Sequence, residues 1–334
     1  MSFKVAVDWG FGFTKAINEL GEKTSFPSIV SSIQKEVGVD LLGTREDYTI
    51  EIDSKRAAVG HLALLHEGVR AWESDYVHNH NLTYLLVTAA ALLNPASHSI
   101  VLGAGLPIAY YRNQKKSVEE MFQGMHCGVR INGGADRRRV DISNVRVFPQ
   151  AAGVYYSEAL NIDGTIKNPE MTNKPVGIID IGYRTTDLLV MQKGRRGATP
   201  RGDLSGGLDR GMNTPMQMIK EELDVEFGDT IPLQWIEQSL LYNNGKLYYC
   251  GKERDLNEYK READKNFVQE ICNIVNQKWG QEINRLACVL IAGGGGKELY
   301  PLFKEQIPQA KVAEDAFYSN ARGFLAAMNL AEKR

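Results

Sequence analysis

A glycine-rich turn near the start of the chain carries an acid and a base whose spacing suits phosphate chemistry. It runs Asp8-Trp9-Gly10-Phe11-Gly12-Phe13-Thr14-Lys15 and lies between apolar residues 3–7 and a second apolar stretch, residues 16–18. Glycine permits positive φ and lets a ligand approach the main chain closely, so the N–H groups of Gly10 and Gly12 could point at phosphate oxygens. The pattern therefore predicts a tight hairpin with Asp8 and Lys15 at its mouth.

The same pattern recurs about half a chain later: an apolar run, an acid, a glycine turn with hydroxyl groups, and a second apolar run. In this second copy of the pattern, the acids are Asp180 and Asp187, the glycine is Gly182, and the hydroxyl residues are Thr185 and Thr186. A metal–phosphate group needs carboxylates for the hard cation and its waters, and N–H, hydroxyl or ammonium donors for the phosphate oxygens. The repeat supplies both kinds of group, which predicts a duplicated fold that holds one phosphate group from two sides.

A third glycine turn follows the apolar residues 288–292 and contains Gly293, Gly294, Gly295 and Gly296 before Lys297. Such a turn has no side chains over its rim, so a flat ring or a phosphate can lie against the backbone. A Walker P-loop is excluded because the spacing and the following Ser or Thr are missing. A Rossmann loop is unsupported because a strand, not a helix, follows the first turn.

The elements that must position these turns alternate between strands and helices. Helical spacing or flanking signals predict helices at residues 79–94, 114–125, 151–160, 232–241, 256–279 and 320–333. Buried strands are expected at residues 99–106 and 288–292, and the pair Asn244-Gly245 is typical of a hairpin turn between two strands. This alternation favours a largely parallel sheet, covered on both faces, in each half of the chain.

Composition limits the functional classes. The chain has 334 residues and a net charge of −2, which suits two domains and gives no support for direct contact with nucleic acid or an anionic membrane. The four cysteines are scattered, as in reduced cytosolic proteins. No secretory signal pattern and no run long enough to span a bilayer occur, so we expect a cytoplasmic protein without a membrane partner.

In this order the motifs resemble those of the actin-type ATPases, and among them the prokaryotic ParM-like filament proteins of plasmid segregation and their archaeal relatives. The resembling segments are the first phosphate loop at residues 8–15, the first connecting motif at 149–153, the second phosphate loop at 180–187, the adenosine motif at 291–296 and the second connecting motif at 319–324. The resemblance implies an α/β fold of the duplicated actin/Hsp70/hexokinase type, with two domains around a nucleotide cleft.

The resemblance also implies residue roles. Asp8 and Asp180 would hold Mg²⁺ through its waters, and Lys15 would reach the β- and γ-phosphate oxygens. Gln150 would orient the attacking water, and Asp187 would help to order it. The residues implied to contact ATP or ADP are Gly10, Gly12, Thr14, Lys15, Gly182, Thr185, Thr186, Gly293, Gly294, Gly295 and Lys297, with Gly206, Lys220 and Glu221 as candidates on the ribose side.

Two positions depart from the family pattern. Phe11 stands where actin and several relatives carry a small hydroxyl residue, so this side chain cannot donate to the γ-phosphate. Tyr183 and Arg184 make the second loop bulkier than usual, and Arg184 either adds a charge near the nucleotide or points to solvent.

We expect domain I at residues 1–150, with a small inserted subdomain at about 30–65 and a C-terminal helix at about 320–334 packing back on it. Domain II is expected at 151–319, with an inserted subdomain at about 200–285. The implied function is nucleotide-dependent polymerisation into a homopolymeric filament, coupled to ATP hydrolysis, for plasmid or DNA segregation. A DNA-binding adaptor protein would link the filament to its cargo.

Two other functions fit the same fold. A sugar-type small-molecule kinase needs a carboxylate base beside the acceptor hydroxyl, whereas the first connecting motif offers the amide of Gln150. A non-polymerising regulatory ATPase of the Hsp70 or reactivase type would bind the same nucleotide without forming filaments.

Overall fold

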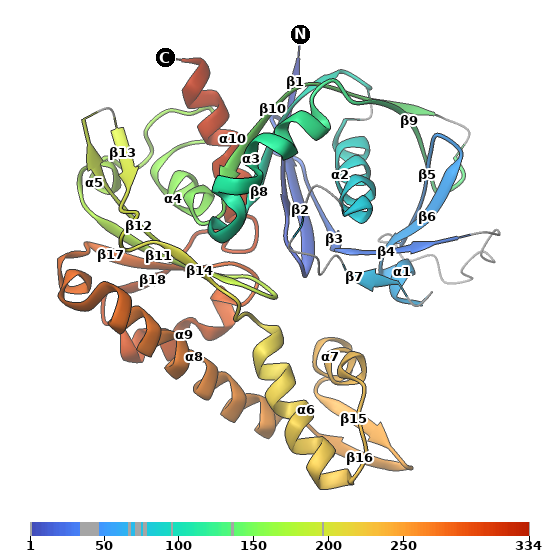
Figure 1. The fold of residues 1–334 in the computed structure, drawn as a ribbon, viewed down its shortest axis with the longest axis vertical. Coiled ribbons are helices and arrows are strands. Elements are labelled where there is room, and N and C mark those ends of the chain that lie inside the picture. The colour runs from blue at the N-terminus through green and yellow to red at the C-terminus, as the bar shows by residue number, and fades with distance from the viewer. Residues whose placement is uncertain are drawn as a thin grey trace.

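Two β-sheets, one in each half of the chain, organise the fold (Figure 1). The computed structural model describes residues 2–33, 47–65, 68–70, 75, 79–94, 96–134, 137–195 and 197–333. Residues 34–46 of the expected first insertion therefore lie outside the described residues.

Within the described residues, the first sheet has ten strands. They are β1 (Phe3–Trp9), β2 (Phe13–Asn18), β3 (Lys23–Pro27), β4 (Ile29–Ser32), β5 (Asp47–Ile52), β6 (Lys55–Gly60), β7 (Val69–Arg70), β8 (Ser99–Leu106), β9 (His126–Ile131) and β10 (Arg138–Pro149). Their spatial order is β3-β2-β1-β8-β10-β9-β5-β6-β4-β7. Only β1, β8 and β10 pair in parallel, and the other neighbours are antiparallel. The strands of the expected first insertion thus continue the same sheet.

This sheet curls around one apolar helix, α2 (His80–Leu93), which contacts strands from β1 to β6 as well as β9 and β10 (Figure 1). Leu85, Leu86, Val87 and Ala90 of α2 are fully buried, because strands surround the helix on several sides. The helices α1 (His61–Leu65) and α3 (Ile108–Phe122) also belong to this half.

The second sheet has a similar parallel centre. Its strands are β11 (Val176–Ile181), β12 (Thr186–Gly194), β13 (Gly197–Pro200), β14 (Gly206–Leu208), β17 (Cys288–Ala292) and β18 (Ala310–Val312). They run in the order β13-β12-β11-β17-β18, with β14 paired to β12. The pairs β11–β17 and β17–β18 are parallel, and the pairs of β12 are antiparallel. The expectation of largely parallel sheets was therefore wrong outside the centre of each sheet.

Helices cover both faces of the second sheet. Alternate side chains of β11 point to opposite faces: Ile178 packs with α4 (Ala152–Ala159), and Ile179 packs with α8 (Asn257–Trp279) and α9 (Gly296–Gln306). The short α5 (Pro169–Asn173) lies near β12 and β13, and the 3-10 helix η1 (Gly280–Arg285) follows α8.

A smaller unit extends from the second sheet and has its own apolar cluster. It consists of α6 (Asn213–Phe227), α7 (Leu233–Tyr242) and the hairpin of β15 (Lys246–Tyr249) with β16 (Lys252–Asp255). The hairpin turn is Cys250-Gly251, both with positive φ, whereas Asn244-Gly245 joins α7 to β15. The hairpin predicted at Asn244 was misplaced because both turns need the same left-handed backbone.

Two connections between the halves cross at glycines. Helix α4 follows the first sheet, and α10 (Ser319–Glu332) returns to it, lying against β1, β2 and β8 (Figure 1). A Cβ atom on Gly323 would stand 1.7 Å from the carbonyl oxygen of Gly153. Only glycine at both positions lets the two helices approach this closely.

Several boundaries differ from the expected ones. Helix α3 starts at Ile108, six residues before the predicted helix at 114, because Pro107 precedes it with a φ that suits a helix start. Strand β10 contains an irregularity of its pairing with β8 between Ile142 and Asn144. None of the helices in the described part of the chain is both long and apolar enough to cross a lipid bilayer.

Candidate active site

The two acidic turns occupy matching places in the two sheets. In the β1–β2 hairpin, Asp8 lies opposite Lys15, and in the β11–β12 hairpin, Asp180 lies opposite Asp187 at the same distance from the turn. Each acid stands on a strand at the parallel centre of its sheet, next to β8 or β17. The repeat seen in the sequence is therefore also a repeat in strand register.

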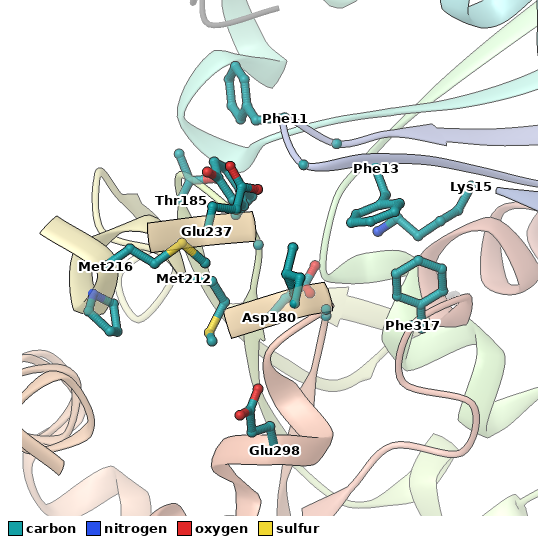
Figure 2. A pocket seen from close by; sticks show the side chains of 18 of the residues that line it. Phe11, Phe13, Lys15, Asp180, Thr185, Met212, Met216, Glu237, Glu298 and Phe317 are labelled. Carbon is teal, nitrogen blue, oxygen red and sulfur yellow. The ribbon is translucent and has the colours of Figure 1, made fainter. Parts of the chain in front are cut away.

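Both hairpins face one cavity of about 300 Å³ between the two halves (Figure 2). The predicted residues that line it are Asp8, Gly10, Gly12, Lys15, Gln150, Asp180, Gly182, Thr185, Gly293 and Gly294. Asn320 of the second connecting motif also lines the cavity, as do residues that the sequence did not single out, among them Met212, Met216, Glu237, Lys260, Asp264, Glu298 and Phe317.

The first hairpin presents a buried charged pair held by an amide. The Lys15 ammonium lies 2.8 Å from Asp8 Oδ2, and Gln150 Nε2 donates to Asp8 Oδ1 at 2.8 Å. Lys15 also lies over the ring of Phe317, 5.2 Å from its centroid. Gln150 reaches Asp8 because β10, which ends at Pro149, runs parallel to β8 beside β1. The predicted acid, base and amide are thus in direct contact.

The second hairpin presents an acid held by the second connecting motif. Asn320 Nδ2 donates to Asp180 Oδ2 at 2.7 Å, and its Oδ1 accepts from the N–H of Ala151 at 3.1 Å. Ala151 has a φ of +66°, an unusual conformation for alanine that aims its N–H at Asn320. Burial and the negative charge of Asp8 raise the pKa of Asp180 to about 6. The two acids therefore interact across the cavity.

Asp187 lies behind Asp180 and does not line the cavity. Its Oδ1 accepts from the N–H of Ile108 at 3.2 Å, at the start of α3. Burial and the charge of Asp180 raise the pKa of Asp187 well above its usual value. Asp187 therefore contacts the start of α3, and its role toward an attacking water stays a prediction.

Glycine is required where the loops meet the cavity. Gly293 has a φ of +84°, and a Cβ there would stand 2.2 Å from the carbonyl oxygen of Ile181. A Cβ on Gly12 would stand 2.7 Å from Cβ of Tyr183, so the two phosphate-type loops touch at this point. Gly294, in contrast, has open space at its Cβ position.

The remaining predicted residues lie outside the cavity lining. Thr14 supports the first loop from behind, because its Oγ1 lies 3.0 Å from Ser28 Oγ, which donates to the Gly10 carbonyl. Thr186 donates to the carbonyl of Arg210, and Lys220 pairs with Asp224 on α6. The predicted residues that do not line the cavity, besides Asp187, are Thr14, Thr186, Gly206, Lys220, Glu221, Gly295 and Lys297.

Phe11 is a wall of the cavity and is almost entirely buried, with 6% of its surface exposed. The guanidinium of Arg184 lies over its ring, 5.2 Å from the centroid, and pairs with Asp209 at 3.0 Å. Arg184 is not among the cavity-lining residues. The two departures from the family pattern are therefore in contact with each other.

A second set of contacts joins the two halves on the side of the small α6–α7 unit. Arg70 of β7 forms an ion pair with Glu237 of α7 and donates to the Gly12 carbonyl at 3.1 Å. Its guanidinium also lies over the ring of Tyr183, 4.4 Å from the centroid. Sequence reasoning missed this bridge because neither Arg70 nor Glu237 belongs to a recognisable motif.

The fold is the two-domain actin-type α/β fold, as the sequence predicted. Its two sheets have matching centres, helices cross between them, and the paired acidic hairpins surround one cavity. The chain belongs to the actin-like proteins and is ParM-like. A family model described as "Actin like proteins N terminal domain" matches residues 6–153. A second, described as "Archaeal actin homologue MreB-like, C-terminal", matches residues 178–305.

Solved structures agree with this assignment. A non-polymerisable quadruple mutant of pCBH ParM is 25% identical, with 98% of this chain and 99% of that chain covered and a TM-score of 0.81. A 15-stranded ParM filament from Clostridium botulinum is 24% identical over 98% and 99% of the chains, with a TM-score of 0.82. An archaeal actin homologue in complex with ADP is 19% identical, with 99% of this chain and 100% of that chain covered and a TM-score of 0.79. No curated protein matches the sequence significantly.

Proposed function

We propose that this chain binds ATP with Mg²⁺ between the two acidic hairpins, hydrolyses it, and polymerises into filaments in a nucleotide-dependent way for plasmid or DNA segregation. The observation that carries the proposal is the convergence of Asp8, Lys15 and Asp180 from two hairpins of matching register on one cavity. Membership of the actin-like proteins and likeness to ParM structures support it.

The carboxylates suit a hard divalent cation. Asp8 and Asp180 come from opposite halves and are buried, and burial together with the charge of Asp8 raises the pKa of Asp180. Among the residues that the structure describes, no group of three or more His, Cys, Asp or Glu side chains could hold a metal ion by itself. Two acids with waters and phosphate oxygens suit Mg²⁺, which when bound would neutralise charge on the β- and γ-phosphates.

The chain's own groups account for the remaining chemistry. Lys15 offers an ammonium to phosphate oxygens, and backbone N–H groups of the two glycine turns offer further donors. Gln150 uses its amide nitrogen to hold Asp8, which leaves its carbonyl oxygen to accept from an attacking water. In this proposal Asp187 supports the start of α3 and does not act on the water, because its Oδ1 accepts from the N–H of Ile108 and it is not among the cavity-lining residues.

Closure of the cleft links the nucleotide to polymer stability. A γ-phosphate held by both hairpins favours the closed arrangement, and hydrolysis removes the contacts that favoured it. With a net charge of −2, the chain is better suited to reach DNA through an adaptor protein than by direct contact. A sugar-type kinase is disfavoured because the amide of Gln150 stands where that chemistry needs a carboxylate base.

Light scattering and pelleting with ATP, ADP and a non-hydrolysable ATP analogue, together with phosphate release, test the proposal. We expect polymer only with nucleotide, and none with the Asp180→Ala variant. Glu305→Ala removes an exposed acid on α9 that does not line the cavity and should behave like the unaltered protein. A soluble, monomeric ATPase under all conditions would overturn the polymerisation part, and phosphorylated sugar as product would favour the kinase.

The bridge between Arg70 and Glu237 predicts an effect on nucleotide release. Replacing Arg70 with methionine removes an ion pair between the halves and a donor to the Gly12 carbonyl, so the cleft should open more readily. We expect release of a fluorescent ATP analogue to become about tenfold faster in stopped-flow displacement. Arg130→Met breaks an exposed pair with Glu51 in the same sheet and serves as the control. Equal release rates in both variants would contradict a role in closure.

A further inference from the structure

Each acidic hairpin has a side-chain amide that holds its acid. Gln150 Nε2 donates to Asp8 Oδ1 at 2.8 Å, and Asn320 Nδ2 donates to Asp180 Oδ2 at 2.7 Å. Gln150 lies just before α4, and Asn320 lies in the first turn of α10, so both amides stand where the crossing helices begin. The pair of an acid with an amide is therefore repeated in the two halves, as the hairpins themselves are.

Asn320 differs from Gln150 because it also reaches the connection that leaves the first half. Its Oδ1 accepts from the N–H of Ala151 at 3.1 Å, and Ala151 directly follows Gln150 in the chain. Burial and the charge of Asp8 raise the pKa of Asp180 to about 6, and both Asn320 and the N–H of Ala151 oppose this rise. The amide, the acid and this N–H group therefore meet at one point.

The backbone at Ala151 has an unusual conformation, with φ of +66° and ψ of −32°. Positive φ is unfavourable for a residue with a Cβ atom, and alanine has no polar side chain that could hold such a turn. Conformations of this kind persist where the surroundings determine them, and they are concentrated at functional sites. The bond from Ala151 to Asn320, which is only 5% exposed, supplies part of that support.

The main chain at Gln150 is held on both sides. Its own N–H donates to the carbonyl of Leu106, at the end of β8, at 2.7 Å, and the next N–H along the chain donates to Asn320. A Cβ atom on Gly153 would stand 2.7 Å from Cα and from Oδ1 of Asn320. Glycine at position 153 therefore lets Asn320 approach the start of α4 closely enough to hold this stretch.

We infer that Asn320 is a positioning residue for hydrolysis: its amide couples Asp180 of the second half to the backbone that places Gln150 in the first. An amide donates and accepts at the same time, whereas an ionised carboxylate only accepts and an apolar side chain does neither. A shift of Asp180 is then transmitted to Gln150 through one side chain. This inference rests on the proposed function, because it takes Gln150 as the residue that orients the attacking water.

Hydrogen exchange of the Ala151 amide, measured by nuclear magnetic resonance on protein with isotope-labelled alanine, tests the coupling without nucleotide. We expect Asn320→Ala to speed this exchange about 10-fold, because the N–H loses its acceptor. Asp180→Ala releases the other end of the same amide, so exchange should become about threefold faster. The double variant should exchange at the rate of Asn320→Ala, because Asp180 acts through Asn320.

The amide of Ala104, at the centre of the first sheet, is the internal reference for these measurements. Its exchange rate should stay the same in all three variants. A local effect at Ala151 is thereby separated from a general loss of stability, which would speed exchange at both positions.

A double-mutant cycle on ATP hydrolysis tests the role toward Gln150. We expect Asn320→Ala to slow single-turnover phosphate release by about 30-fold. Asn320→Ala combined with Gln150→Ala should be no slower than Gln150→Ala alone, because the first residue acts through the second. Asn329→Ala is the matched control: Asn329 is an amide on the same helix that donates to the carbonyl of Ile162 and does not line the cavity. That variant should hydrolyse ATP at the unaltered rate.

Two results would overturn the inference and leave the proposed function intact. One is an unchanged Ala151 exchange rate in Asn320→Ala or in Asp180→Ala. The other is a double variant in which the separate effects of Asn320→Ala and Gln150→Ala multiply. If the unaltered protein hydrolyses no ATP, the proposed hydrolysis fails instead, and the exchange rates still decide whether Asn320 couples the two halves.

Discussion

Replacing Gln150 with alanine is expected to slow ATP hydrolysis by about 100-fold while ATP binding stays within about threefold. The buried amide donates to Asp8 Oδ1 and has its carbonyl oxygen left for a water, so its removal takes away a water acceptor and not a phosphate donor. Polymers assembled with ATP should then persist, because the nucleotide contacts that favour closure are lost only slowly.

Single-turnover phosphate release, with ATP affinity measured separately, distinguishes this outcome from a loss of binding. Gln217→Ala is a suitable control, since Gln217 is exposed on α6 and does not line the cavity. Asp180→Ala should differ from Gln150→Ala by losing nucleotide binding itself. Unchanged hydrolysis in Gln150→Ala would remove this residue from the proposed mechanism.

Replacing Gly323 with alanine is expected to lower the free energy of unfolding by about 3 kcal/mol. At an exposed position inside a helix, Gly→Ala raises the free energy of unfolding by about 1 kcal/mol. The effect expected at Gly323 therefore has the opposite sign to the one that helix propensity alone would give. The reason is steric: the added Cβ would stand 1.7 Å from the carbonyl oxygen of Gly153 and 2.5 Å from its carbonyl carbon. Backbone atoms cannot move aside as a flexible side chain can.

Urea denaturation followed by circular dichroism measures this change. Gly202→Ala provides the comparison, because its added Cβ would meet nothing closer than Arg112 Nη2 at 3.7 Å. We expect that variant to be near neutral. Equal stability of Gly323→Ala and the unaltered protein would mean that α4 and α10 can separate without cost.

The sequence predicted the fold class and the elements with strong local signals. Helices α2 and α8 lie within about a residue of their expected bounds, because a long apolar stripe and clear end signals determine a helix locally. The duplicated acidic turns also depend on neighbouring residues alone, and the strand register places Asp8 and Asp180 equivalently. Their roles toward a nucleotide stay a prediction.

The side-chain contacts that the sequence could not predict join residues that lie far apart in the chain. Asn320 stood in a recognised motif, but its bond to Asp180 joins residues far apart in the chain. In the sequence, Asp264 is one of many charged residues on a polar helix. Only its burial and its unpaired Oδ1, both visible in the structure, distinguish it from the others. Lys220 and Glu221 were chosen by analogy, and their positions on α6 fall outside the cavity lining.

The glycine crossing of α4 and α10 has a mechanical consequence. Two helices in backbone contact leave little room for sliding where they cross, so a rotation of one half against the other would have its pivot at this point. The β15–β16 hairpin lies at the opposite end of the molecule from the end of α10 (Figure 1). A small rotation about the pivot would therefore move this outer tip much further than the acidic hairpins, as a lever arm amplifies a short stroke.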